Sequence, residues 1–169
     1  MKSTIARLTL ALGTALMLTV GASALERPAG DVVLTVRGAI TQKNAGEAAE
    51  FDPAMLRALP GRDAKLQTPW TEGETGFSGP YLRAVLEEVG ATGSRLIIRA
   101  LNDYAAEVPV GDAVDFDTIL AIDMNGEPMT VRNKGPLFLI YPFDTNPDLY
   151  NEKYFSRSVW QIKEIVVVE

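Results

Sequence analysis

Short apolar runs separated by turn-forming residues dominate the pattern of the chain after residue 30. Most of these runs have the length of a strand rather than that of a helix, and they are rich in branched and aromatic side chains. We therefore predict strands at residues 31–36, 65–68, 94–101, 104–110, 118–122, 129–132, 137–141 and 159–168.

Two segments instead have the spacing of short amphipathic helices. Residues 52–60 begin with Asp-Pro, in which Asp suits the N-cap and Pro the first helical position. In residues 78–90 apolar side chains recur three and four positions apart, with Ser78 as the expected N-cap and Gly90 as the stop. Together with the strands, these helices predict one β-rich α+β domain with two short helices, built mostly from hairpins.

The connections are predicted to be polar. Residues 42–50 are expected to form a surface loop, and residues 112–117 an acidic connection with one helical turn. Residues 143–154 are expected to form a polar, aromatic-containing loop, also with one helical turn.

Trp70 lies in a polar, glycine-rich stretch, Thr68 to Gly79. Because Gly adopts backbone angles that other residues avoid, this stretch is predicted to be a loop that approaches a ligand closely. A tryptophan held there suits stacking on a flat ligand. The alternative, a half-buried Trp that closes the edge of the core, has equal weight on the sequence alone.

The first 24 residues have the pattern of a cleaved signal peptide. Two basic residues precede an uncharged apolar run, residues 8–20, and Ala22-Ser23-Ala24 is a small-residue cleavage signal. The apolar run is short for a membrane span. We therefore expect a periplasmic protein whose residues 25–169 form a single domain that is not inserted in the membrane after cleavage.

Charge and composition narrow the function. The chain has 16 basic and 22 acidic residues, a net charge of −6. Such a balance argues against binding to nucleic acid or to anionic lipid. There is no Cys and no His, which excludes disulfides, thiolate metal ligands, cysteine nucleophiles and Ser-His-Asp triads.

Acid–base chemistry would therefore fall to Asp, Glu, Tyr or Lys, and a metal site would use oxygen ligands only. The densest carboxylate cluster, Asp112, Asp115 and Asp117, lacks the glycine and the closing Glu of a calcium loop. It indicates a solvated acidic connection. We predict no catalytic residue and no metal ligand, and we favour a binding protein over an enzyme.

Candidate binding residues lie at predicted turns. Asp103 and Tyr104 are at the bend of a hairpin, and Arg132 is in a basic turn. Arg157 is surrounded in the sequence by aromatic residues, on which a guanidinium can stack. The structural alternatives are turn chemistry for Asp103, a solvated turn for Arg132 and ordinary aromatic packing around Arg157.

An ordered set of motifs carries a family resemblance. In chain order they are TPW, F-x-GP-x-L-x-x-VL, RALNDY-x-x-x-x-P, ILA-x-x-x-NGEPM, R-x-KGP-x-x-x-IYP and WQI-x-x-I. From Leu34 to Val168 the chain resembles the oxidoreductase molybdopterin-binding domain, which is shared by the sulfite oxidase and methionine sulfoxide reductase catalytic-subunit families. The resemblance implies a sulfite oxidase-like fold.

In that family the fold holds a pterin dithiolene with a molybdenum atom whose one protein ligand is a cysteine. This chain has no cysteine to carry over. It is more similar to the small periplasmic regulators of the same fold, which bind a reduced pterin without molybdenum and control a membrane receptor with cyclic-di-GMP turnover activity. The resemblance implies a pterin site that includes Trp70, and we extend that site to Asp103, Tyr104, Arg132 and Arg157.

Two other functions stay open at this stage. One is a molybdopterin-dependent oxidoreductase, which would need Asp or Ser as its metal ligand. The other is a protein-interaction scaffold that binds no small molecule.

Overall fold

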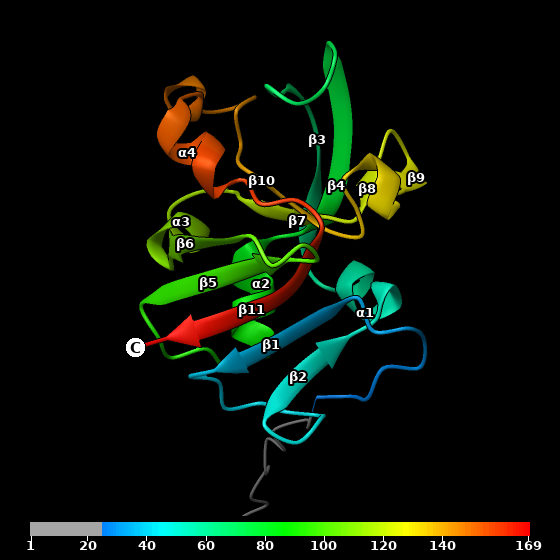
Figure 1. Ribbon diagram of the computed structural model, residues 1–169, viewed down its shortest axis with the longest axis vertical. Helices are drawn as coiled ribbons and strands as arrows, with labels where there is room; N and C mark the ends of the chain where they lie inside the picture. Colours follow the sequence, from blue (N-terminus) through cyan, green and yellow to red (C-terminus); the bar gives the residue numbers. More distant parts are fainter. Residues whose placement is uncertain (1–24) are drawn as a thin grey trace, which may run out of the picture.

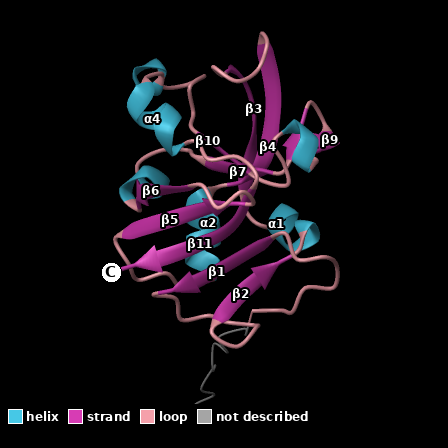
Figure 2. Cartoon of the chain, viewed as in Figure 1, coloured by secondary structure: helices cyan, strands magenta, loops and turns pink. Residues whose placement is uncertain are grey.

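The computed structural model describes residues 25–169, so the predicted signal peptide lies outside the described residues (Figure 1). Strands dominate this part of the chain, with four short α-helices and two 3-10 turns (Figure 2). The predicted β-rich α+β class is confirmed, although the number of helices exceeds the two expected. Within residues 25–169 no helix is both long and apolar enough to cross a membrane.

A five-stranded sheet, in the order β2-β1-β11-β5-β6, forms one half of the domain. The C-terminal strand β11 lies at its centre, parallel to β1 and antiparallel to β5. Helix α2 lies behind this sheet in Figure 1 and buries its apolar face in the shared core. The strands are β1 (Leu34–Gly38), β2 (Ala48–Phe51), β5 (Arg95–Ala100), β6 (Ala105–Pro109) and β11 (Ile162–Val168).

The other half is built around a long hairpin. Strands β3 and β4 pair along their whole length and project at the top of Figure 1, so that residues 68–73 form the tip. The four-stranded order is β3-β4-β8-β9, and β7 pairs with β10. The strands are β3 (Gly61–Gln67), β4 (Glu74–Pro80), β7 (Ile119–Ala121), β8 (Asp123–Met124), β9 (Glu127–Pro128) and β10 (Phe138–Ile140).

Both predicted helices are present. The Asp52 side chain caps the first by accepting a hydrogen bond from the Met55 N–H at 2.9 Å. The second begins after Tyr81 and not after Ser78, because Ser78 belongs to a strand. The helices are α1 (Pro53–Ala58), α2 (Leu82–Glu88), α3 (Gly111–Val114) and α4 (Glu152–Arg157), with 3-10 turns η1 (Val131–Asn133) and η2 (Pro147–Leu149).

The predicted glycine-rich loop is much shorter than expected. Gly76 and Gly79 lie in strand β4, and only residues 68–73 are loop. A Cβ atom on Gly79 would lie 2.0 Å from the backbone oxygen of Leu120. This glycine therefore allows close approach of β4 to β7, and the prediction that it belongs to a loop was wrong.

Three other segments differ from the prediction. Part of the expected surface loop 42–50 is the edge strand β2, whose alanines give a weak strand signal. The expected strand 129–132 is not a strand, and its residues 131 and 132 belong to the turn η1. Much of the expected loop 143–154 is η2 and the start of α4, a helix with no buried residue and therefore no apolar stripe to reveal it.

Candidate functional site

A cavity of about 420 Å³ lies beside Trp70, where the hairpin tip, the β5–β6 turn and α4 meet. Its size falls in the range of small-molecule sites, about 300–1,000 Å³. Aromatic and small polar side chains make up most of its wall. The lining residues are Trp70, Ala100, Asn102, Tyr104, Glu152, Phe155, Ser156, Ser158, Val159 and Trp160.

Trp70 is the centre of an aromatic cluster. Its ring centroid lies 5.7 Å from those of Phe138, Phe155 and Trp160, each in an edge-to-face arrangement. Phe138 is fully buried, whereas Trp70 is half-buried. The indole therefore closes the edge of the core, as the structural alternative expected. It also lines the cavity, which a role in stacking on a ligand would require.

Two residues of the β5–β6 turn line the cavity, and the residue between them does not. Asp103 has a left-handed backbone, with φ 65°, so the chain reverses sharply there. Asn102 and Tyr104 line the cavity, while the Asp103 carboxylate accepts a hydrogen bond from Lys163 at 2.7 Å. That hydrogen bond holds the pKa of Asp103 below its usual value. The Tyr104 hydroxyl donates to the backbone oxygen of Ser156 at 3.3 Å, which joins the turn to α4.

Helix α4 uses two faces. Glu152, Phe155 and Ser156 are three and four positions apart, so they share one face, and all three line the cavity. Tyr154 and Arg157, also three apart, contact the body of the domain on another face. Glu152 is the charged residue in the cavity wall, since the other lining residues are neutral.

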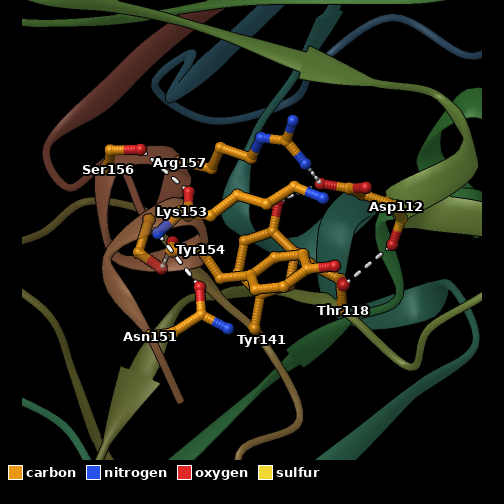
Figure 3. A network of polar contacts seen from close by, with 9 residues as sticks. Asp112, Thr118, Tyr141, Asn151, Lys153, Tyr154, Ser156 and Arg157 are labelled. Carbon is orange, nitrogen blue, oxygen red and sulfur yellow. Dashed lines mark hydrogen bonds and ion pairs between the residues drawn. The ribbon is translucent and has the colours of Figure 1, made fainter. Parts of the chain in front are cut away.

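A buried polar network anchors the second face of α4 (Figure 3). Arg157 donates to Asp112 Oδ2 at 2.8 Å, and the Tyr141 hydroxyl donates to the same oxygen at 2.7 Å. Thr118 donates to the backbone oxygen of Asp112 at 2.9 Å. Burial, followed by the hydrogen bond to Asp112, raises the pKa of Tyr141 well above its usual range, so this hydroxyl keeps its proton.

A smaller hollow of about 330 Å³ adjoins the cavity and shares Trp70 with it. Arg132 and Lys134 line this hollow together with Glu72. The Lys134 ammonium lies 4.9 Å from the centroid of the Trp160 ring, within the range of a cation–π contact. Basic groups are thus present next to the cavity but not in its wall.

The structure separates the five residues predicted to bind the ligand. Trp70 and Tyr104 line the cavity, and Arg132 lines the adjoining hollow. Asp103 and Arg157 lie outside both, in ion pairs with other residues of the domain. The binding roles of these five residues stay predictions.

The sequence interpretation did not assign Glu152, Phe155 or Trp160 to the site. Trp160 is the first residue of the WQI motif, which was a usable signal. The spacing of Glu152 and Phe155 becomes informative only when residues 152–157 are known to be helical. Nothing in the sequence marks that helix strongly.

Comparisons with known proteins identify the family and agree with the fold. The profile of the oxidoreductase molybdopterin binding domain matches residues 54–168, and the chain therefore belongs to this family. Its fold is similar to the crystal structure of the sulfane dehydrogenase SoxCD from Paracoccus pantotrophus, with a TM-score of 0.55 and 17% identity. The match covers 80% of this chain but only 37% of the SoxCD chain. No curated protein sequence matches the chain.

The site fits the pterin ring of the family's cofactor better than it fits the metal. Its aromatic wall and carboxylate suit a flat pterin ring, which has a π-face and hydrogen-bond donors at its edge. The cysteine thiolate that binds the metal in the family is absent from the sequence. Within residues 25–169, no three acidic, His or Cys residues gather closely enough to bind a metal. The residues present fit the pterin, and they do not supply the thiolate.

Proposed function

We propose that this chain is a periplasmic pterin-binding protein that holds a reduced pterin, without molybdenum, in the cavity beside Trp70. The observation that carries the proposal is an aromatic cavity with one carboxylate in its wall, in a family member that has no cysteine. The family's pterin-binding capacity is thereby kept while its thiolate chemistry is lost.

The energetics of such a site are favourable. Packing of a flat ring on Trp70, Phe155 or Trp160 contributes about 0.5–1.5 kcal/mol for each aromatic contact, beyond the area that is buried. Polar groups in the wall then orient the ring, because an edge donor buried without a partner costs free energy. Asn102 and Tyr104 come from a tight turn and Phe155 from a helix, so the wall is largely preformed.

We further propose that the protein, with pterin bound, regulates a membrane receptor that has cyclic-di-GMP turnover activity. The contact would be with the periplasmic domain of that receptor. The support is the predicted signal peptide and the resemblance to small periplasmic regulators of this fold. A pull-down with the periplasmic domain of a receptor encoded beside this chain tests the proposal. We expect capture to change with reduced pterin, and equal capture with and without pterin would contradict it.

Anaerobic calorimetric titration with a tetrahydropterin tests the binding itself. We expect saturation at one pterin per chain, together with a rise in the unfolding temperature, because a ligand that binds only the native state stabilises it. A stoichiometric molybdenum content after expression in a molybdenum-supplied host would instead favour the oxidoreductase. No binding of any pterin would favour the scaffold.

A further inference from the structure

Glu152 lies where a side chain could form hydrogen bonds with the polar edge of a ligand in the cavity. It is exposed, it opens helix α4, and it is the charged residue of the cavity wall. Among residues 25–169 it makes no side-chain hydrogen bond and no ion pair. The carboxylate expected from the sequence, Asp103, is already paired with Lys163 outside the cavity. Glu152 thus keeps its acceptor oxygens for a ligand.

The remaining wall groups complement this carboxylate. Phe155 lies one turn further along the same helical face and packs against Trp70 with ring centroids 5.7 Å apart. Residues three apart on a helix are about 5–6 Å apart at their Cβ atoms, so a ring placed on the aromatic wall lies within reach of Glu152. Asn102 accepts the Tyr104 N–H at 3.2 Å through Oδ1, which leaves its amide nitrogen as a donor.

A 2-amino-4-oxopteridine matches this arrangement of donors and acceptors. Its ring N3–H and its 2-amino group present two neighbouring N–H donors, and its O4 is an acceptor. A carboxylate accepts two parallel N–H bonds, and such charge-assisted pairs are stronger than neutral ones. In a 2,4-dioxopteridine (a lumazine) an oxygen replaces the amino group, so that a lone pair would face the carboxylate.

We propose that Glu152 is the specificity-determining residue of the cavity and selects 2-amino-4-oxopteridines over 2,4-dioxopteridines. This inference rests on the proposed function, since it names the ring class that the same site accepts. The carboxylate accepts the paired N–H donors of the pyrimidine edge, and Asn102 donates toward the O4 side. Discrimination arises because the wrong ring turns the lone pair of its 2-oxo group toward the carboxylate and leaves that carboxylate without its second N–H donor.

The test compares affinities of the full-length mature protein for tetrahydropterin and for tetrahydrolumazine. The variants are Glu152→Gln and the control Glu88→Gln, which changes an exposed glutamate on α2 away from the cavity. We expect Glu152→Gln to weaken tetrahydropterin binding by about 10- to 100-fold, as loss of a charged hydrogen-bond acceptor does. Tetrahydrolumazine binding should change by less than about threefold, because an amide can donate to its 2-oxo group.

The ratio of the two affinities is the deciding readout, since general damage to the site would weaken both ligands. Glu152→Asp, which keeps the charge on a shorter side chain, should retain part of the preference for the amino ring. If wild-type protein binds tetrahydropterin but Glu152→Gln leaves the ratio unchanged, the role of Glu152 is overturned while the proposed function stands. If wild-type protein binds neither ring, the proposed function itself fails, and the role of Glu152 falls with it.

Discussion

At the scale of single residues, the cavity depends most on Trp70. Its indole contacts the fully buried Phe138 and two aromatic rings of the cavity wall, Phe155 and Trp160. Truncation would remove one wall of the cavity and part of the packing on the core. Ligand affinity measures the loss of the wall, and the free energy of unfolding measures the loss of core packing.

For Trp70→Ala we predict a loss of at least tenfold in affinity for a reduced pterin, measured by anaerobic titration. The free energy of unfolding should fall by only about 1–3 kcal/mol, less than for a fully buried aromatic residue, because Trp70 is half-buried. Tyr81→Ala removes a half-buried aromatic outside the cavity and should keep wild-type affinity. Normal pterin binding by Trp70→Ala would place the site elsewhere.

Asp52 gives a prediction about pH. Its carboxylate accepts hydrogen bonds from the backbone N–H groups of Met55, Ala29 and Gly30, each at 2.9 Å. These bonds, that of Met55 first, lower the pKa of Asp52 below its ordinary value of 3.8. A lowered folded-state pKa stabilises the fold above that ordinary value, and the stabilisation is lost as the pH falls through the folded-state pKa.

We therefore expect Asp52→Asn to lower the free energy of unfolding at neutral pH, with a difference from wild type that shrinks below about pH 4. Urea unfolding over a series of pH values measures this difference. Asp31→Asn, a change at an exposed carboxylate, serves as the control. A difference for Asp52→Asn that stays constant on acidification would contradict the assigned hydrogen bonds.

At the scale of elements, α4 is the part of the cavity wall that packs least firmly on the core. It has six residues, none of them fully buried, and it carries both Glu152 and Phe155. Its position depends on the half-buried Tyr154 and Phe155 and on the pair between Arg157 and Asp112. We therefore expect Arg157 to influence pterin binding through the position of α4.

Arg157→Gln should destabilise the domain by about 1–3 kcal/mol, because the Asp112 carboxylate then keeps only the Tyr141 partner in a buried site. Amide hydrogen exchange across residues 152–158 should become faster, and pterin affinity should fall. The double variant Asp112→Asn/Arg157→Gln should recover part of the stability, since it removes the uncompensated charge. Unchanged exchange in α4 would argue that the pair does not hold the helix.

Gly79 is the second element-scale test. Because a Cβ atom there would lie 2.0 Å from the backbone oxygen of Leu120, Gly79→Ala must push β4 away from β7. We predict a loss of at least about 2 kcal/mol in the free energy of unfolding. Gly111→Ala, where the nearest atom is 3.5 Å away, should stay within about 1 kcal/mol of wild type. Equal effects of the two substitutions in a thermal unfolding experiment would contradict the close approach.

These elements also show what a sequence can predict. Helix α1 was predictable because its cap and its proline act within a few residues, and β5 was predictable from its apolar run. The strand character of β4 was not, because Gly79 is required by a contact with β7, far along the chain. In the site, Asp103 was a reasonable candidate, but its direction is set by a left-handed turn and by Lys163, which the local sequence does not reveal.

At the scale of the whole molecule, the domain keeps the family fold but spans only 37% of the SoxCD chain that it resembles. The cavity next to Trp70 is present, and the thiolate that the family uses for its metal is not. The wall offers aromatic faces and one carboxylate, which suits a ring with N–H donors at its edge. A ligand-binding role without thiolate-bound metal is consistent with the cavity, its wall and the missing cysteine.

Native mass spectrometry of the protein purified anaerobically from its own cells tests this account most directly, because it weighs protein and ligand together. We predict one adduct per chain with the mass of a reduced 2-amino-4-oxopteridine and no metal. An adduct with the mass of a molybdenum-containing pterin dithiolene, or a chain that stays unliganded even after tetrahydropterin is added in excess, would contradict it.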